Sequence, residues 1–562
     1  MTRKEVGTSR LGLHLSDASV AASGETSVYG RDLAVESFLQ ALWKHGQDGD
    51  YNFFYTPEIL TGDSRAEGLL RGLCSGQSGK RALIQPASQL KTEFEQYRFS
   101  AWHDADAGLD SAARLRSRFS SRLYPITATV HILSYQGLLF GWVLKLLLQR
   151  IQPCDALVCI SRSCRVAVKN LFEQVADRIR AEHGLKLSFP GQLPIIPYSI
   201  DLESFRPQSK PAARRQLGLP DAAFVIGWIG RLSPLDKADL LPSLQVFSRL
   251  IEANPSRNLV LMIAGSGPPR LHGILATHAD QLGIRERVVF VSPLPPQRRS
   301  LAHAAADVFV SPVDNLQETL GTTPIEAMAC GVPQVVSDWN GYRDIVQHDE
   351  TGFLIPSYWA ECDSAICLQS GVYDDYDLLD HFSLAQSVAV DLGAYQRALQ
   401  ALIENDDLRE KMSRASRKSA LDRFSGRTVI RAFEELWVHL GEIAANLPHE
   451  RAPLPPYDEP AFFSAFRHYA SSLIDDETQV RITELGRDTV EGRASLPFAY
   501  AGLSSLSSSA LAGALARLDK SAGSLSFGVI AGELQRDMGG TIAPARQHLL
   551  WLMKYGLIEP CS

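Results

Sequence analysis

The sequence predicts an α/β protein of several domains, in which helices cover both faces of parallel sheets. Apolar runs of strand length alternate with helical patterns through most of the chain, and this alternation is typical of parallel sheets. At 562 residues the chain is too long for one domain of usual size, so three or four units are expected. The strand-like runs are 51–55, 82–84, 126–131, 156–160, 193–198, 223–230, 259–264, 288–294, 307–312 and 334–337.

Helical spacing of apolar residues appears between and after these runs. The segments 33–43, 385–405 and 427–447 are amphipathic. A proline-rich stretch, 451–460, then predicts a linker. Beyond the linker the sequence predicts a small, mainly helical C-terminal extension whose order resembles a winged helix. Its segments are 501–516, 528–534, 543–555 and a final apolar pair at 557–558.

Composition and charge narrow the class of protein. Hydrophobic residues make up 45% and charged residues 21% of the chain, which is usual for a soluble globular protein. The net charge of −7 argues against a general nucleic-acid binder. Residues 500–562 hold five Lys and Arg against four Asp and Glu. We therefore expect no nucleic acid partner, and we interpret the extension as a protein-interaction module, with a homodimer through it left open.

The apolar segments of the sequence are shorter than a signal peptide or a membrane-spanning helix requires. The first 20 residues contain no apolar core of signal-peptide length. The longest apolar segment, 138–148, has 11 residues and includes Lys145, whereas a spanning helix needs about 20. A cytoplasmic protein is expected, in which 138–148 is a buried core helix. Peripheral contact with the inner face of a membrane stays open.

The eight cysteines are scattered and do not suggest a disulfide framework. Cys154, Cys159 and Cys164 form the one cluster in the sequence. The apolar run 156–160 predicts a buried strand there, and zinc ligands usually come as closer pairs. Buried thiols are therefore favoured over a metal site.

The segment 311–356 carries the pattern that points to chemistry. Glu318 and Glu326 stand eight positions apart, with Gly321 and Thr322 between them. Residues 324–329 predict a helix that is closed by Gly331 and the proline two residues later. This places Glu318 on a loop, Gly321 and Thr322 at a helix N-terminus, and Glu326 in the first turn.

A helix N-terminus offers unpaired backbone N–H groups and the positive end of a dipole, so it is suited to bind phosphate. Glutamates on either side make sense if they accept hydrogen bonds from the hydroxyl groups of neutral sugars. A sugar nucleotide has this layout, with a hexose, a diphosphate and a ribose in sequence. The plainer alternative is that Glu326 is a favourable first-turn anion and Glu318 a solvated loop charge.

The pair Glu318-x7-Glu326, together with AMACGVP at 327–333 and ETGFLIP at 350–356, resembles the donor half of retaining GT-B glycosyltransferases of the glycosyltransferase 4 (group 1) type. The resemblance covers about residues 10–445. It implies a Rossmann-like domain at 1–200 on the acceptor side and a second at 201–425 on the donor side. It also implies a helix at 426–450 that returns to the first domain, leaving 451–562 as linker and extension.

The resemblance implies a role for each of the following residues. Arg231 and Lys237 would bind the donor diphosphate, helped by the backbone near Gly321 and Thr322. Glu326 would bind the ribose, Glu318 the transferred sugar, and His131 the same sugar from the opposite domain. Two cations can balance a diphosphate and stabilise it as a leaving group, so no metal and no cofactor are expected.

The resemblance implies further contacts with the donor, and this sequence departs from the family pattern at two places. Gly265 ends a strand in a glycine turn, and the base would lie near 291–294, with Leu294 at its end. The loop 22–30 lacks the usual double glycine, so only Gly24 is carried over. Leu320 stands where relatives commonly have an aromatic residue, which weakens inference about the sugar.

Four alternatives stay open at this point. His131 at a strand end is often structural. Asp104 and Asp106 beside His103 could indicate a metal-dependent GT-A enzyme, although the sequence places them in a polar loop without a supporting strand. The whole could also be a sugar-nucleotide epimerase or a sensor without turnover. Donor base, sugar and acceptor, whether glycan, lipid-linked, small molecule or protein, are not readable from the sequence.

Overall fold

The computed structural model describes residues 10–16, 30–47, 49–56, 64–75, 79–90, 94, 99–295, 298–362, 378–448, 461–497, 506–521 and 523–561. Two compact units divide the chain, one reaching Tyr457 and the other running on from Asp458. The first unit contains two parallel six-stranded sheets, and the second contains a small antiparallel sheet with helices.

The N-terminal half of the first unit is a parallel sheet in the order β3-β2-β1-β4-β5-β6. Successive side chains of its strands face opposite sides, so Leu11 and Leu13 pack toward α1 while the intervening Gly12 lies under the Trp102 ring. The strands are β1 (Arg10–Ser16), β2 (Asp50–Thr56), β3 (Arg81–Pro86), β4 (Phe99–Asp104), β5 (Ile126–Val130) and β6 (Ala156–Cys159). The helices are α1 (Gly30–His45), α2 (Arg65–Cys74), α4 (Leu109–Phe119), α5 (Gln136–Leu148) and α6 (Arg162–His183), with a 3-10 turn, η2 (Ala87–Gln89).

The C-terminal half repeats this connectivity in the order β12-β11-β10-β7-β8-β9, again with parallel strands. Its strands are β7 (Phe224–Ile229), β8 (Leu259–Ala264), β9 (Val288–Val291), β10 (Val308–Ser311), β11 (Gln334–Ser337) and β12 (Gly352–Ile355), beside an antiparallel pair, β13 (Ser357–Tyr358) and β14 (Ala389–Val390). Its helices are α7 (Lys210–Leu217), α8 (Leu241–Ala253), α9 (Pro269–Gln281), η3 (Arg285–Arg287), α10 (Arg299–Ala305), α11 (Thr322–Ala329), α12 (Tyr342–Ile345), α14 (Leu378–Ala385), α15 (Leu392–Glu404) and α16 (Asp406–Arg423).

In each sheet the first strand lies between the second and the fourth strand of that half, so the strand order reverses there. These topological switch points are β1/β4 in the N-terminal half and β7/β10 in the C-terminal half. Ligands of open α/β sheets bind beyond the carboxyl ends of the strands at such points. The fold therefore indicates one binding edge on each sheet.

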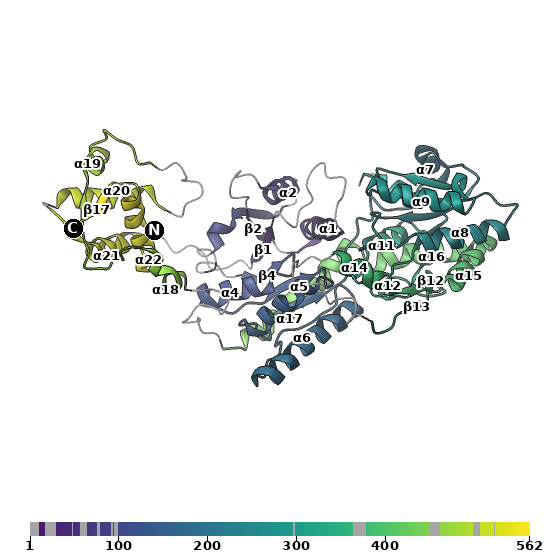
Figure 1. The fold of residues 1–562 in the computed structure, drawn as a ribbon, viewed down its shortest axis with the longest axis horizontal. Helices are drawn as coiled ribbons and strands as arrows, with labels where there is room; N and C mark the ends of the chain where they lie inside the picture. Colours follow the sequence, from purple (N-terminus) through teal and green to yellow (C-terminus); the bar gives the residue numbers. More distant parts are fainter. Residues whose placement is uncertain are drawn as a thin grey trace. The chain divides into compact units, whose positions relative to one another are not determined.

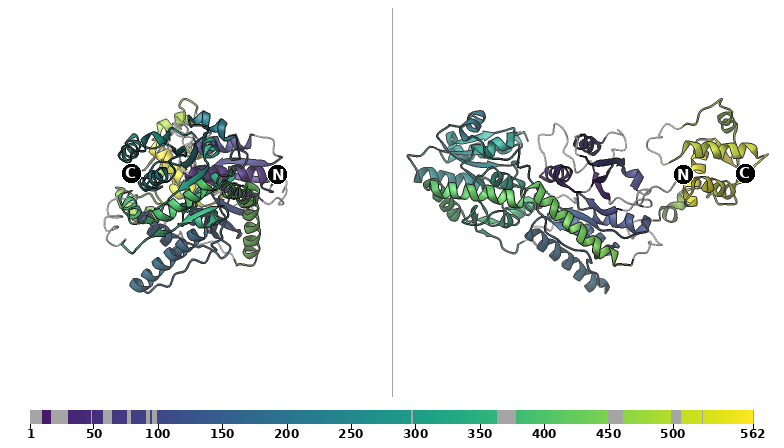
Figure 2. Two further views of the ribbon diagram at one scale, coloured as in Figure 1. Left: turned by 90° about the vertical axis from the view of Figure 1, so that its right-hand side faces the viewer. Right: turned by 180° about the vertical axis from the view of Figure 1, so that it is seen from behind.

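The chain passes between the halves twice, and the two passages run side by side. The backbone N–H of Ile200 donates to the carbonyl of Phe424 over 2.9 Å. After the second passage α17 (Gly426–Ala445) packs on α1 and β4. In the right-hand view of Figure 2 the consecutive green helices, α16 and α17, run from the C-terminal half to the N-terminal half. The indole Nε1 of Trp437 donates to the Thr127 hydroxyl over 2.9 Å, so a late helix completes the N-terminal core.

Several expected elements differ from those observed. β1 and β4 are strands that the sequence analysis did not predict, and Asp104 ends β4 rather than lying in a loop without a strand. The run 193–198 is no regular strand: it only borders β6 through bonds such as Cys159 N–H to Pro194 C=O at 2.8 Å, because its prolines cannot donate. The predicted helix 385–405 is broken by β14, and Asp391 caps α15.

The apolar segment 138–148 lies in α5 and is buried on one side only. Val143 and Leu146 are fully buried, while Leu138 and Phe140 are 38% and 45% exposed. No helix among the described residues has the length and apolar character needed to cross a membrane. The three cysteines of the central cluster are buried, as expected.

The second unit packs three helices against a short sheet in the order β16-β15-β17 (Figure 1). Arg517 pairs with Glu533 and Asp537, and Arg546 pairs with Asp476, so these basic side chains are neutralised locally. The elements are α18 (Phe462–Phe466), η5 (Arg467–Tyr469), β15 (Gln479–Ile482), α19 (Glu484–Val490), α20 (Ser508–Lys520), β16 (Leu525–Ser526), α21 (Phe527–Met538), α22 (Ile542–Lys554) and β17 (Ile558–Pro560).

Close approach of two strand ends predicts that Gly265→Ala destabilises the C-terminal half. A Cβ atom at Gly265 would lie 1.7 Å from the Gly230 carbonyl oxygen, so the backbone after β7 or β8 would have to move. We expect a large fall in the thermal unfolding midpoint. Gly273→Ala in α9 is the matched control: a Cβ there meets no atom within 4 Å, and the change should stabilise the helix by about 0.5–1 kcal/mol. Equal midpoints for the two variants would contradict this packing.

Candidate functional site

A cavity of about 460 Å³ is walled by residues from both halves of the first unit. From the N-terminal half come the start of α1, His131 after β5, and Tyr198. From the C-terminal half come the segments that follow β7, β8, β9 and β10. Predicted site residues on this wall are His131, Arg231, Lys237, Gly265, Leu294, Glu318, Gly321 and Thr322.

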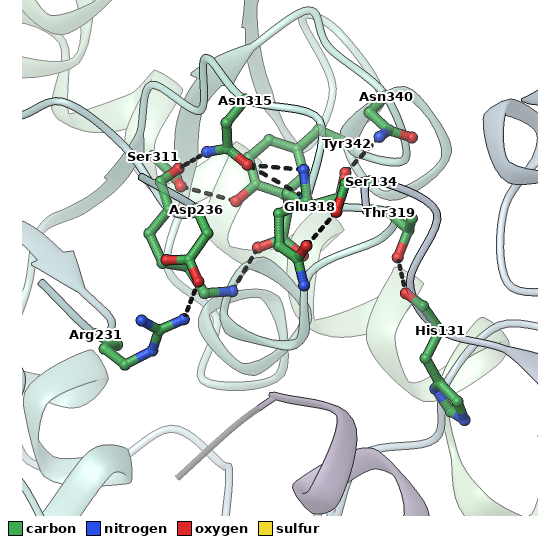
Figure 3. Close-up of polar contacts among 12 residues, drawn as sticks. His131, Ser134, Arg231, Asp236, Ser311, Asn315, Glu318, Thr319, Asn340 and Tyr342 are labelled. Carbon is green, nitrogen blue, oxygen red and sulfur yellow. Dashed lines mark hydrogen bonds and ion pairs between the residues drawn. The ribbon is translucent and has the colours of Figure 1, made fainter. Parts of the chain in front are cut away.

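Two basic side chains follow β7 and line the cavity, each held by a carboxylate. Figure 3 shows one of these pairs, Arg231 with Asp236. Arg231 Nη2 donates to Asp236 Oδ2 over 2.7 Å, and Lys237 Nζ donates to Glu318 Oε2 over 3.0 Å. Burial alone would raise the pKa of Asp236, but its bonds and charge interaction with Arg231 hold that pKa below its usual value. The ion pairs therefore fix both cations at the wall while keeping charge balanced.

The N-terminus of α11 forms the next part of the wall. Gly321 precedes the helix with φ 91°, and a Cβ there would lie 2.6 Å from the Tyr342 ring, so only glycine fits. Thr322 begins the helix and also lines the cavity. The hydroxyls of Tyr342 and Ser311 bond over 2.8 Å and support the glycine from behind. The positive end of this helix thus lies in the cavity wall beside Arg231 and Lys237.

The position of Glu326 differs from the expected one. Because α11 begins at Thr322, Glu326 lies in the second turn rather than the first, and it is 2% exposed and absent from the cavity wall. Its carboxylate bonds to Arg299, and its Oε2 accepts from His303 Nε2 over 3.1 Å. Arg299, which the sequence analysis did not identify, is the member of this group that lines the cavity.

The protonation of this buried group follows from its surroundings. Burial lowers the pKa of His303 despite the adjacent carboxylate, so the imidazole is neutral and donates through Nε2. Burial opposes ionisation of Glu326, but the Arg299 charge and the His303 bond together hold its pKa below the usual value. Glu326 is therefore an anion that orients Arg299.

His131 lines the cavity, but its ring nitrogens are engaged within the protein. Nε2 donates to the Ala105 carbonyl over 2.7 Å, so Nδ1 is the acceptor for the Tyr198 hydroxyl at 2.8 Å. Burial lowers the pKa of the imidazole, which fits this neutral tautomer. The backbone carbonyl of His131 accepts from the Thr319 hydroxyl over 2.7 Å. His131 is thus a fixed part of the wall rather than a group poised to exchange protons.

Besides Glu326, one predicted residue among those described, Leu320, is not brought to the cavity. Leu320 is 1% exposed and packs in the core. The position at which relatives commonly have an aromatic residue therefore does not face the cavity here. Gly24 lies outside the described residues.

The loop that carries Glu318 is held by the N-terminal half. Thr319 donates to the carbonyl of His131, and its own carbonyl accepts from the Ser161 hydroxyl over 2.9 Å. Ser134 bonds to Gln317, the residue before Glu318, and His381 of α14 donates to the Ser134 carbonyl over 2.7 Å. The two halves are therefore joined by hydrogen bonds directly beside the cavity.

Comparison with known proteins concerns mainly the C-terminal half. Residues 209–366, which contain Arg231, Lys237, Arg299, Glu318 and Glu326, match the family model for glycosyl transferases group 1. Residues 209–366 are a group 1 glycosyltransferase domain.

Curated relatives of this group 1 domain are bacterial proteins named D-inositol 3-phosphate glycosyltransferase. That of Stackebrandtia nassauensis is 34% identical over 243 residues, covering 41% of this chain and 52% of the relative. That of Nocardia farcinica is 32% identical over 183 residues, covering 31% of this chain and 40% of the relative. The chain thus spans about half or less of the length of these relatives.

Solved structures share the fold over a longer stretch. Sucrose-phosphate synthase from Thermosynechococcus elongatus has a TM-score of 0.50 at 17% identity, covering 77% of this chain and 100% of that one. Anabaena HepE, solved with UDP, has a TM-score of 0.50 at 16% identity with the same coverage. The predicted GT-B fold, with two Rossmann-like halves, is confirmed.

The buried Glu326 predicts a stability effect that is separable from ligand binding. Glu326→Ala leaves Arg299 without its counterion, and breaking a buried pair costs about 3–5 kcal/mol. The thermal midpoint without ligand should fall by several degrees. Glu435→Ala, which removes the exposed pair with Arg431 on α17, is the control and should change stability by less than about 1 kcal/mol. A full-length protein that tolerates Glu326→Ala without loss of midpoint would show that this ion pair is not formed.

Asp314, in the segment after β10, predicts a pH-dependent stability. Burial raises its pKa from 3.8 to about 7, and its Oδ1 lacks a hydrogen-bond partner among the described residues. The folded state therefore holds a proton that the unfolded chain has lost, so this residue makes stability fall as pH rises from about 4 to about 7. Asp314→Asn removes that dependence, and its midpoint relative to the unsubstituted protein should increase over this interval. A midpoint difference that stays constant between pH 4 and pH 8 would contradict the assignment.

Proposed function

We propose that the protein transfers a sugar from a nucleoside diphosphate sugar to an acceptor, with retention at the anomeric carbon and without a metal. The observation that carries this proposal is one cavity in which Arg231, Lys237 and the N-terminus of α11 lie together on the donor side. This places cationic groups around a volume open to both sheets. Such an arrangement suits an anionic leaving group that departs toward one half while a second substrate enters from the other.

The diphosphate is the part of the donor that this site is suited to bind. Its negative charges would be shared by the guanidinium of Arg231, the ammonium of Lys237 and the dipole of α11. These groups also stabilise the charge that develops as the glycosidic bond breaks, which is the largest electrostatic demand of the reaction. Because the cations are already oriented by Asp236 and Glu318, little reorganisation is needed when the diphosphate binds.

Comparisons support the donor class without identifying it. The group 1 domain match covers the segment that carries these residues, and relatives are named as glycosyltransferases. HepE was solved with UDP, so UDP and UDP-sugars are the first ligands to test. Arg299 would contact the nucleoside end of the donor, because its bond to Glu326 holds its guanidinium in the cavity wall.

The ion pairs also bear on how configuration would be retained. Glu318 is paired with Lys237, and Glu326 lies behind Arg299, so neither carboxylate is offered as a nucleophile in this state. We propose a same-face attack. The bond from the anomeric carbon to the diphosphate breaks, the acceptor oxygen bonds to that carbon, and the acceptor proton passes to the departing phosphate oxygen.

Lys237→Ala tests the donor site directly. A ligand at 100 times its dissociation constant stabilises a protein by about 2.7 kcal/mol, so a nucleoside diphosphate sugar that binds should raise the thermal midpoint measurably. Lys237→Ala should abolish that rise across a panel of nucleotide sugars. Lys418→Ala is the control, because this exposed lysine of α16 pairs with Asp422 on the same helix, and its ligand-induced shift should equal that of the unsubstituted protein.

Two outcomes would overturn the proposal. If the ligand raises the thermal midpoint of Lys237→Ala as much as that of the unsubstituted protein, the diphosphate does not bind in this cavity. Donor binding with neither transfer nor release of nucleoside diphosphate, across acceptors of every class, would indicate a sensor rather than an enzyme.

A further inference from the structure

We infer that Asn315 is a positioning residue of the donor site, which ties the backbone that carries Lys237 to the loop that carries Glu318. The inference rests on the proposed function and extends it by naming a residue that acts on the donor through others. It is carried by three hydrogen bonds that converge on one buried side-chain amide.

The amide of Asn315 bridges two segments of the chain. Its Nδ2 donates to the backbone carbonyl of Lys237 over 2.5 Å, in the segment after β7. Its Oδ1 accepts from the backbone N–H groups of Gln317 and Glu318 over 3.0 Å and 3.3 Å, in the segment after β10 (Figure 3). A carbonyl only accepts and an N–H only donates, so these partners fix which end of the amide carries the nitrogen.

Sheet pairing among the described residues stops short of these two segments. The pairing of β7 with β10 reaches only Gly227 and Phe309, and both chains then leave the sheet as irregular loops. A side-chain amide has the donor and the acceptor of a peptide group. Asn315 therefore supplies, beyond the strand ends, the kind of bond that joins the strands before them. Asp314 adds another, since its Oδ2 accepts from the Asp239 N–H over 3.3 Å.

The surroundings of Asn315 indicate how it acts. The residue is 2% exposed and is not part of the cavity wall. All three of its bonds nevertheless go to residues that line the cavity, which are Lys237, Gln317 and Glu318. Hydrogen bonds are stronger in a buried medium of low dielectric constant than in water. Asn315 thus acts on a ligand in the cavity through the residues that it holds.

The segment after β11 supports Asn315 in turn. The indole Nε1 of Trp339 donates to the Asn315 carbonyl over 2.8 Å. The Trp339 ring contacts the ring of Trp359, with centroids 5.9 Å apart. The next residue, Asn340, donates to the carbonyl of Glu318. Both ends of the loop 315–318 are therefore held by one neighbouring segment.

The pair of Lys237 with Glu318 depends on the separation of the two loops. Its 3.0 Å bond requires that both backbones stay in register. If the loops moved independently, the ammonium of Lys237 would not keep its place near the N-terminus of α11, and a bound diphosphate would have to order it again. Ordering a side chain on binding costs affinity, which a preorganised site avoids. Asn315 thus contributes to donor affinity and to the alignment that transfer requires.

Asn254 is the matched control, because it is a buried asparagine with a purely structural setting. It is 8% exposed and is not part of the cavity wall. Its side chain joins the end of α8 to α15: Nδ2 donates to Gln400 Oε1 over 2.8 Å, and Oδ1 accepts from Gln400 Nε2 over 3.0 Å. Loss of either amide leaves buried partners without their bonds and should lower the thermal midpoint. Loss of the Asn315 amide alone should also weaken nucleotide binding.

The test measures nucleotide affinity on the full-length protein. UDP, GDP and ADP are titrated by calorimetry, and the one that binds the unsubstituted protein most tightly is used for every variant. Asn315→Ala should raise its Kd about tenfold, as expected when a side chain must be ordered on binding. Asn254→Ala should leave the Kd unchanged. Equal Kd values for Asn315→Ala and the unsubstituted protein would overturn the inference and leave the donor assignment intact. No binding of any of the three nucleotides to the unsubstituted protein would overturn the proposed function, and the inference with it.

A milder pair of variants decides the question if Asn315→Ala does not fold. Trp339→Phe keeps an aromatic ring and removes the N–H that bonds to the Asn315 carbonyl, so the Kd should rise about threefold, in line with the loss of one hydrogen bond. Trp359→Phe is the control, since Trp359 Nε1 donates to the Ser387 hydroxyl over 3.1 Å instead. Its Kd should equal that of the unsubstituted protein. The inference is wrong if Trp339→Phe and Trp359→Phe bind the nucleotide equally well.

Discussion

Compensation of positive charge by a neighbouring carboxylate governs the arrangement of the cavity. Lys237 is paired with Glu318, Arg231 with Asp236, Arg299 with Glu326, and Arg31 with Asp106. A partly buried cation without a counterion is costly, and its long side chain would not stay in one orientation. The carboxylates therefore hold the basic side chains in the cavity wall before an anion binds. A bound diphosphate would then share cations that already point toward it.

The repeated connectivity of the two sheets explains why ion pairs from both halves lie around one cavity. Each half places its switch point at the carboxyl edge of its own sheet, and the loop 317–319 bonds to the loop after β5. Residues from the start of α1 and from the loop after β5 thus come to the same cavity as residues from β7 and β10. The same bonds restrict the relative movement of the halves at the position of Glu318. Closure of the cleft would have to begin by rearranging them.

Local patterns in the sequence were sufficient to predict the loop before α11 but not the ion pairs formed by the residues around it. Gly321 and Gly331 both take positive φ and bound α11, as the helix punctuation indicates. The Arg299 pair was not predictable, because its partner Glu326 lies 27 positions away and no periodicity links a helix start to a buried carboxylate. Glu326 itself was expected in the first turn but lies in the second, since the helix begins at Thr322, two residues before Pro324.

Strands β1 and β4 were missed for a different reason. β1 and β4 carry His14, His103 and Asp104 among their apolar residues, so they do not read as continuous buried strands. Their polar side chains are accommodated because they lie at the carboxyl ends of the strands or find partners, as His103 does with the Thr127 hydroxyl at 3.0 Å. Sequence rules for strands that look for continuous apolar runs therefore fail where polar residues interrupt the run.

The return of α17 to the N-terminal half has a consequence for biosynthesis. Trp437 bonds to Thr127, and the two residues are separated by 310 positions. At translation rates of about 5–20 residues per second, the ribosome needs about 15–60 s to make the intervening chain. Throughout that time the nascent first sheet has an uncovered apolar face where Phe433 and Trp437 will later pack. Chaperones would therefore meet a half-finished domain whose last piece is still being translated.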